Sequence, residues 1–254
     1  MTLPREESRV RVFEFGNTMP PPEWELNEPM ATGYSRVYYI TEGDLRYEDE
    51  YESCAIDHDT LYVLPSSIPY RVKKTTDRRF ACMFLHIDFS PISVVRLTRL
   101  PASPDSMLAH YVRTLQLAIA DRRRDVVRSL CQAMPAFLDT DPSFRRPSEE
   151  MAEILSYIEQ HLDEKIDIEL LSQRVGYHPN YFYSFFKNTM RITPHQYIIK
   201  RRILRAQILL HSDCPIGQVA ASVGLSDAAS FTRLFKSITG KTPTQYAKSA
   251  HMIP

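Results

Sequence analysis

The sequence is poor in cysteine, and its four cysteines stand far apart. It has no Cys-x-x-Cys pair and no cluster of cysteine with histidine. This spacing argues against both a structural zinc site and a disulfide framework. We expect each thiol to be reduced and packed among its neighbours, namely Cys54, Cys82, Cys131 and Cys214.

Long apolar runs are also missing. No stretch approaches the roughly 20 apolar residues that a membrane-spanning helix needs. Residues 1–30 are rich in proline and glutamate and lack the apolar core of a signal peptide. We therefore expect no membrane partner and a cytoplasmic location. The length of 254 residues fits one large or two ordinary domains.

The balanced net charge hides two opposite parts. From residue 170 onward there are 11 Lys and Arg and 2 Asp and Glu, a net charge of 11 − 2 = +9. Residues 1–169 hold the remaining 20 basic and 29 acidic residues, a net charge of 20 − 29 = −9. A basic C-terminal part beside an acidic body is typical of nucleic-acid binders, although on composition alone it could be a solvated surface.

The basic part contains one motif written twice. Four residues recur in similar form 48 positions later (216 − 168): Ile168, Leu171, Val175 and Gly176. Six more recur 49 positions later (231 − 182): Phe182, Phe186, Lys187, Pro194, Gln196 and Tyr197. The extra residue falls after the glycine, where an insertion in a turn does least harm.

Each copy predicts two helices that meet at a sharp turn. Gly176 can end the first helix with a positive φ, and His178-Pro179 can start the second. In the second copy, Ser226-Asp227 opens the second helix. Phenylalanines give that helix a buried side, and polar residues lie on the other side. This pattern indicates a helix-turn-helix, whose second helix enters the DNA major groove. A small helical bundle without a ligand is the alternative.

The second copy resembles the signature of the AraC/XylS family of bacterial transcription regulators. The signature reads Gly-Leu at 224–225, Ser-Asp at 226–227, Phe-x-Arg-x-Phe-Lys at 231–236, Gly240, and Pro-x-x-Tyr at 243–246. The resemblance covers roughly residues 150–249. It implies a helical DNA-binding domain in which one long helix joins two helix-turn-helix units. Arg191 departs from the pattern, because the second copy has Gly240 at that place.

The resemblance also assigns roles to residues. It implies that bases are read by Asn180, Tyr183, Ser184, Ala228, Ala229, Thr232 and Arg233. Phosphate contacts are expected from Lys187, Arg191, Lys236 and Lys241. The joining helix is expected from Thr193-Pro194 to about Leu210, a length of roughly 25 Å. Its basic residues are expected to stay on the surface: Lys200, Arg201, Arg202 and Arg205.

The N-terminal part reads as short strands divided by turns. Strands are expected over 35–41, 45–52, 60–64, 70–74 and 80–89, and residues 10–15 alternate in the same way. Such strands predict an all-β barrel or sandwich. Their order resembles the cupin-like N-terminal domain of the same family, through Tyr39-Ile40-x-x-Gly43, then Asp59-x-Leu61-x-x-Leu64-Pro65, then Pro69.

Metal-binding cupins use a His-x-His pair with a glutamate and a third histidine. Here His58 and His86 are single, so we expect no metal, no cofactor and no catalytic residue. A small barrel can instead hold one small ligand. Alternation directs some of the following side chains inward: Arg36, Tyr38, Tyr47, Tyr70 and His86. The 14 tyrosines would suit a sugar, although tyrosine is equally ordinary core material.

Two amphipathic helices are expected within 104–138, followed by a linker at 139–147. In the family, helices at this place pair two subunits, so the resemblance implies a homodimer. Their apolar sides could instead cover the barrel. The predicted domains are 1–138 for ligand sensing and dimerisation, and 148–254 for DNA binding. The predicted fold class is α+β, a cupin-like β-barrel with following helices and an all-α double helix-turn-helix domain.

Together these features predict a transcription regulator that binds double-stranded DNA in a sequence-specific way. We expect an activator in which a small-molecule effector in the barrel changes how a homodimer presents its DNA-binding domains. RNA polymerase is a further expected partner. One alternative is a constitutive regulator whose barrel only dimerises. Another is an enzyme, either a cupin or a DNA-repair protein with metal-bound cysteines; the isolated cysteines argue against the latter.

Overall fold

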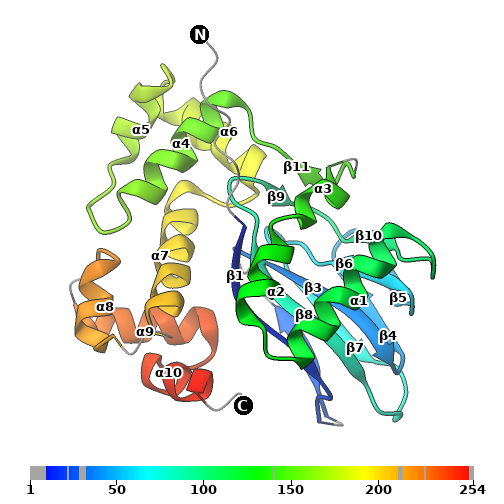
Figure 1. Cartoon of the computed structure of the whole chain (residues 1–254). Helices are drawn as coiled ribbons and strands as arrows, with labels where there is room; N and C mark the ends of the chain where they lie inside the picture. Colours follow the sequence, from blue (N-terminus) through cyan, green and yellow to red (C-terminus); the bar gives the residue numbers. More distant parts are fainter. Residues whose placement is uncertain are drawn as a thin grey trace. The chain divides into compact units, whose positions relative to one another are not determined.

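Figure 1 shows the computed structural model of the chain. It describes residues 10–21, 23–28, 33–139, 141–210, 214–225 and 227–251. The chain divides into two compact units, Met1–Arg146 and Pro147–Pro254. Ser226, which is predicted to help open a helix, lies outside the described residues. Within the described ranges, no helix is long and apolar enough to cross a membrane.

The N-terminal unit is built on two antiparallel sheets. The larger has the order β1-β8-β3-β6-β10, from strands Arg11–Thr18, Ala81–Asp88, Ser35–Glu42, Thr60–Val63 and Thr98–Pro101. The smaller has the order β2-β7-β4-β5, from strands Glu25–Glu28, Tyr70–Lys74, Leu45–Glu48 and Ser53–Ile56. A separate ribbon pairs β9 (Ser93–Val94) with β11 (Phe144–Arg145). The prediction of a cupin-like β fold followed by helices is confirmed.

Strand alternation separates two apolar cores in this unit. On β3, Val37 belongs to one core, and Tyr38 and Ile40 belong to the other. The first core lies between the larger sheet and the helices α1 (Met107–Ala120), α2 (Arg124–Cys131) and α3 (Met134–Leu138). The second lies between the sheets, because it collects buried residues from strands of both. The helices therefore cover one face of the larger sheet (Figure 1).

The predicted strand over 45–52 ends at Glu48, and a hairpin turn leads from there into β5. β4 and β5 pair around Asp49, whose carboxylate accepts hydrogen bonds from the backbone N–H groups of Tyr51 and Glu52 at 2.7 and 2.8 Å. An aspartate that bonds to its own following backbone is a turn signal, and it interrupts the strand. Five strands were not predicted from the sequence, and none of them exceeds four residues: β2, β5, β9, β10 and β11.

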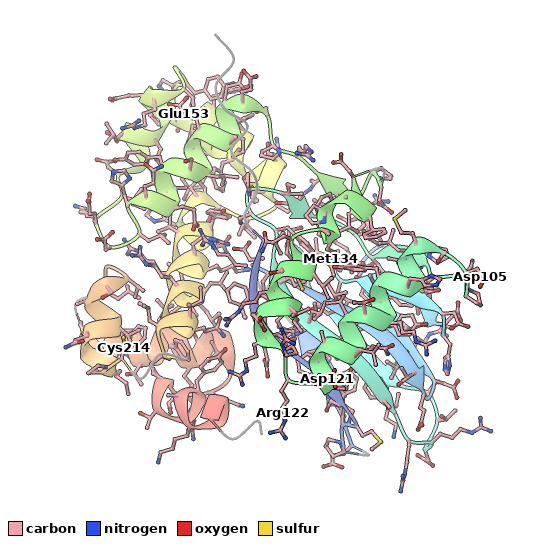
Figure 2. The ribbon with its side chains drawn as sticks, viewed as in Figure 1. Asp105, Asp121, Arg122, Met134, Glu153 and Cys214 are labelled. Atoms are coloured by element: carbon pink, nitrogen blue, oxygen red, sulfur yellow. The ribbon has the colours of Figure 1, made fainter. Side chains whose placement is uncertain are left out.

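Three helices rather than two follow the strands. Pro135 lies in the first turn of α3, and it has no N–H with which α2 could continue. The apolar sides of these helices pack on the larger sheet, so the alternative in which they cover the barrel is what the structure shows. Met107, in the predicted apolar stripe, is 78% exposed. Asp121 and Arg122 are exposed in the turn between α1 and α2 (Figure 2).

The segment 139–147, predicted as a linker, contributes to the N-terminal unit. The Phe144 ring is buried and packs edge-on against Phe89, with ring centroids 5.4 Å apart. The backbone N–H of Val95 donates to the Ser143 carbonyl at 3.0 Å. One aromatic residue among prolines and charges gives no periodic signal, so the sequence cannot reveal that this segment returns to the sheet.

The C-terminal unit is a run of helices. They are α4 (Glu149–Gln160), α5 (Ile168–Arg174), α6 (Pro179–Met190), α7 (Pro194–Leu210), α8 (Ile216–Ser222), α9 (Ala228–Thr239) and α10 (Pro243–His251). The pairs α5–α6 and α8–α9 form the two predicted helix-turn-helix units, and α7 joins them (Figure 1). We call α4–α6 the first half and α8–α10 the second half.

α7 contributes to a separate apolar core in each half. Tyr197 and Ile198 belong to the core of the first half. Ile203, Ala206 and Leu210 belong to the core of the second half. The two halves therefore cover α7 along most of its length. The second helix of each helix-turn-helix, α6 or α9, packs against it.

The prediction that the basic residues of α7 stay on the surface is wrong. Lys200 and Arg201 are 8% and 2% exposed, and Arg202 and Arg205 are half-buried. Arg201 forms an ion pair with the Glu159 carboxylate on α4. Because both halves pack on one helix, few of its positions are left for solvent.

Two apolar residues of the first half depart from the prediction in the opposite sense. Leu170 on α5 and Tyr181 on α6 continue the apolar pattern of their helices, and this pattern predicts that they are buried, but they are 44% and 57% exposed. Tyr181 instead joins an outer aromatic group with Tyr177 and Phe185. Each helix buries a narrower stripe than the run of apolar residues indicates.

Both copies of the motif end their second helix in a left-handed turn. Gly240 has a φ of 75° after α9, and Arg191 has a φ of 62° at the same place after α6. Their backbone N–H groups donate to the carbonyls of Lys236 and Lys187, respectively. The turn is therefore kept although its glycine is lost, and a side chain occupies a conformation that costs roughly 1–2 kcal/mol.

We expect Arg191→Gly to stabilise the C-terminal unit by about 1 kcal/mol, because glycine adopts a positive φ without strain. Denaturant unfolding of the full chain, followed by helical circular dichroism, measures the change. Arg191→Ala is the matched control, because it removes the charge but keeps a side chain at the strained position. It should give no comparable gain; an equal gain in both variants would assign the effect to charge.

Candidate nucleic-acid interface

α6 has a polar outer face because two buried rings fix its inner face. Phe182 and Phe186 are fully buried, one helical turn apart. The predicted base-reading residues Asn180, Tyr183 and Ser184 are exposed on the same helix. They carry an amide, a phenol and a hydroxyl, which can exchange hydrogen bonds with base edges.

α9 has different chemistry at equivalent positions. Ala228, Ala229 and Arg233 are exposed, and Thr232 is half-buried. The Thr232 hydroxyl donates to the Ala228 carbonyl at 2.8 Å, so this residue has mainly a methyl group to offer. One Arg233 Nη2–H donates to the Ser230 hydroxyl at 3.1 Å. A guanidinium has five N–H donors, so others can still reach a guanine.

The start of α9 is fixed by an ionised cap. The Asp227 carboxylate accepts hydrogen bonds from the backbone N–H groups of Ala229 and Ser230 at 3.1 and 3.0 Å. Hydrogen bonds from Ser230 and Ala229 lower the pKa of Asp227. The start of α6 is capped instead by His178, whose Nδ1 accepts from the Asn180 N–H at 3.4 Å. Caps of this kind hold the first turn, which carries several of the predicted base contacts.

Four predicted phosphate contacts lie at the far ends of the same helices. All four side chains are exposed: Lys187, Arg191, Lys236 and Lys241. Lys187 and Lys236 lie in the last turns of α6 and α9, and the other two belong to the turns that follow. In each copy, the predicted base readers lie early in the second helix, and basic residues lie at its end. The base readers are polar in α6 and largely apolar in α9.

In the N-terminal unit, Arg36 is the centre of a buried polar cluster. Its Nη1 donates to the Tyr70 hydroxyl at 3.0 Å and lies 2.5 Å from the Glu28 carboxylate. Its Nη2 donates to the Tyr34 hydroxyl at 3.2 Å. These partners compensate for the desolvation of the guanidinium. Burial raises the pKa of Tyr70 to about 12, so its hydroxyl remains protonated.

The other predicted ligand residues lie near this cluster. The Tyr47 ring stacks on Tyr70 with centroids 5.8 Å apart, and its hydroxyl donates to Asp49 at 2.6 Å. Tyr38 is buried in the same core, and burial raises its pKa. His86 pairs with Arg36 across neighbouring strands.

A neighbouring carboxylate holds the His86 imidazole in place. Its Nδ1 lies 3.0 Å from the Glu14 carboxylate. Burial lowers the pKa of His86, and the hydrogen bond to Glu14 opposes this shift. The sequence analysis did not single out Glu14, Glu28 or Tyr34. Strand pairing brings Glu14 beside His86 and Glu28 beside Tyr70, and no local pattern in the sequence indicates these pairs. Tyr34 lies only two residues before Arg36, so side-chain alternation could have pointed to it.

Metal ligands do not come together in the described part of the chain, where no group of three or more histidine, cysteine or acidic side chains could hold an ion. His58 instead lies 2.9 Å from the Gly43 carbonyl, measured from its Nε2. All four cysteines are free thiols. Cys82 and Cys131 are buried, which raises the pKa of each thiol to about 12.

The sequence of this chain is similar to those of known transcriptional regulators. A helix-turn-helix domain family matches residues 171–249. The probable transcriptional regulator LumQ of Photobacterium leiognathi is 40% identical over 97 residues, covering 38% of this chain and 39% of LumQ. The HTH-type transcriptional regulator YobQ of Bacillus subtilis is 22% identical over 221 residues, covering 86% of this chain and 88% of YobQ. This chain thus covers about two fifths of the length of LumQ, which has the higher identity of the two.

The structure also resembles ToxT from Vibrio cholerae, with a TM-score of 0.69. The alignment covers 94% of this chain and all of ToxT, at 11% identity, so it concerns the fold alone. The C-terminal part of the chain is similar to helix-turn-helix domains of the AraC type. The resemblance to AraC/XylS transcription regulators that the sequence indicates is confirmed.

We expect Lys236→Ala to reduce the salt dependence of DNA binding, lowering the slope of log K against log salt by about 0.9 for the lost phosphate contact. Fluorescence anisotropy on one duplex over a series of salt concentrations measures the slope. Arg113→Ala is the control, because Arg113 is exposed on α1 in the N-terminal unit and its loss removes the same charge. An unchanged slope in Lys236→Ala would contradict the phosphate contact.

Proposed function

We propose that this protein is a sequence-specific transcription regulator that binds double-stranded DNA through both helix-turn-helix units. The observation that carries the proposal is the equivalence of α6 and α9. Each buries two phenylalanines and ends in basic residues, and the predicted base readers are exposed except for the half-buried Thr232. A bundle with no ligand would not need this distribution twice.

The length of the joining helix is compatible with this function. α7 has 17 residues, a length of roughly 25 Å. Recognition helices that bind the same face of DNA must reach major grooves about 34 Å apart. A rigid helix packed against both units can hold them at such a separation, which a flexible connection could not do.

The two units should prefer different bases. Asn180 can bond adenine in bidentate fashion, and Arg233 can bond guanine in the same way. Ala228, Ala229 and the Thr232 methyl group suit thymine methyl groups. The proposed site is therefore asymmetric, with one part read mainly by hydrogen bonds and the other by one arginine and apolar contacts.

We expect Arg233→Ala to weaken binding by about 1–3 kcal/mol at the duplex with its preferred guanine and much less when that base is changed. The preferred site comes from selection of a randomised DNA pool by the full chain at two salt concentrations, followed by sequencing. Ser237→Ala, which changes an exposed residue of the same helix, is the control.

Two results would contradict the proposed base reading. The first is an equal loss of affinity in Arg233→Ala for every duplex, which would make Arg233 a phosphate contact. The second is weak binding by the unchanged chain, without sequence preference and strongly reduced by salt. That second result would leave the basic C-terminal part as a general phosphate-binding surface.

We also propose that the N-terminal unit senses a small metabolite between its sheets, with Arg36, Tyr70 and His86 among its contacts. The supporting feature is the buried, charged and aromatic cluster around Arg36. The tyrosines of this cluster would suit a sugar. ToxT itself has been solved bound to a methylnaphthalenyl-butenoic acid and to an unsaturated fatty acid.

We expect some members of a metabolite panel to raise the melting temperature of the chain. A ligand at 100 times its Kd stabilises the folded state by about 2.7 kcal/mol. Arg36→Met should abolish the shift, because the guanidinium orients the ligand. Arg78→Met is the control, because Arg78 is exposed between β7 and β8. A shift that survives in Arg36→Met would place the ligand elsewhere.

The alternative is a constitutive regulator whose barrel only dimerises. The existing partners of Arg36 favour it, because three protein groups already satisfy this guanidinium. If no ligand shifts the melting temperature and DNA selection is intact, this alternative is supported.

The proposal also includes properties beyond DNA and ligand binding. We propose that the protein is an activator without catalytic activity and that it is located in the cytoplasm. We propose further that it acts as a homodimer and contacts RNA polymerase.

A further inference from the structure

One arginine of α7 bonds to both halves of the C-terminal unit. Arg202 Nη1 donates to the Gly224 carbonyl at 3.3 Å, and Nη2 donates to the Glu164 carbonyl. Glu164 lies between α4 and α5, in the first half, whereas Gly224 forms the turn between α8 and α9, in the second half. One planar guanidinium therefore joins backbone groups that carry the two helix-turn-helix units.

The backbones of the two halves approach each other closely at Gly224. A Cβ added to Gly224 would lie 2.7 Å from the Leu162 carbonyl oxygen and 2.9 Å from Arg202 Nη2. The first of these atoms belongs to the backbone and cannot easily move aside, so only glycine fits against the segment that follows α4. The backbone of the second helix-turn-helix thus rests against the first half.

The repeat provides an internal comparison. Gly176 holds the equivalent place in the first copy, and its φ of 69° matches the 68° of Gly224. A Cβ added to Gly176 would meet nothing within 4 Å. The turn of a helix-turn-helix therefore explains the positive φ of both glycines. It does not explain the close approach at Gly224, which is specific to the contact between the halves.

Polar groups, and not the two apolar cores, form the contact between the halves at Gly224. The first core is formed by residues of α4, α5, α6 and the start of α7, and the second by residues of the rest of α7 with α8, α9 and α10. Packing on α7 holds each half to that helix, and the hydrogen bonds of Arg202 link the two halves directly. Hydrogen bonds from a charged donor are stronger than those between neutral groups, and a planar fork fixes direction as well as distance.

We propose that Arg202 fixes the angle and distance between the two DNA-reading helices, with Gly224 permitting the contact. Arg202 is then a positioning residue: it acts through α6 and α9 without touching bases. This inference rests on the proposed function of a double DNA reader. Its consequence is strict spacing, because a preorganised pair of readers fits only one separation of the two half-sites.

The first test measures the geometry without DNA. Asn188→Cys and Ser237→Cys place spin labels at equivalent exposed positions of α6 and α9, in a background in which the four native cysteines are replaced by alanine. Double electron–electron resonance should give a narrow distance distribution for this chain and a clearly broader or shifted one after Arg202→Met. An unchanged distribution would overturn the proposal.

The second test measures spacing on DNA with the full chain. The selected duplex is compared with duplexes in which one base pair is added or removed between the half-sites, which rotates one half-site by roughly a tenth of a turn. The ratio of native to respaced affinity should fall by about fivefold or more in Arg202→Met, because flexible readers tolerate either spacing. Gly224→Ala should lower the ratio as well.

Gly176→Ala is the matched control for Gly224→Ala, because it adds the same methyl group at the same φ without the contact between halves. It should keep the spacing ratio of the unchanged chain. Arg202→Lys preserves the charge and should fall between the unchanged chain and Arg202→Met, which provides a folded variant if the methionine unfolds the unit. Equal losses of affinity at every spacing would make Arg202 merely structural and overturn the proposal. Failure of the unchanged chain to select any DNA would refute the proposed function while leaving the distance measurement valid.

Discussion

The C-terminal unit depends on one constraint: α7 must be buried in two cores at once. Its first turns pack with the aromatic core of the first half, and its later turns pack with the core of the second half. A helix covered by both partners has little room for exposed side chains, so even Lys200 and Arg201 are buried. Burial of these charges requires partners, which explains the ion pair between Arg201 and Glu159.

A related constraint shapes the N-terminal unit. Because successive side chains of a strand point to opposite faces, β3 supplies Val37 to the helix-covered core and Arg36 and Tyr38 to the other face. An arginine on the inner face must meet hydrogen-bond acceptors, and it finds them in Tyr34, Tyr70 and Glu28. The cluster therefore satisfies a structural requirement and also provides charged and polar groups that a ligand could use.

Comparison of the two copies separates what the helix-turn-helix needs from what this protein adds. Both copies keep the paired phenylalanines and the left-handed turns, which are requirements of the fold. They differ in the exposed residues of α6 and α9, in Arg191 against Gly240, and in the surroundings of Gly176 and Gly224. The differences lie where DNA recognition and the contact between halves would be decided.

The repeat, the helix starts, the buried phenylalanines of α6 and α9 and the strand-rich N-terminal part could all be predicted from the sequence. Those features follow from local periods and caps, which residues a few positions apart specify. Long-range packing was needed to show that Phe144 returns to the first core, that the basic residues of α7 are covered, and that Arg36 meets Tyr70 and Glu28. It also placed Arg202 between Glu164 and Gly224. Such contacts join residues far apart in the chain, so no local pattern encodes them, and they arise only when whole faces pack together.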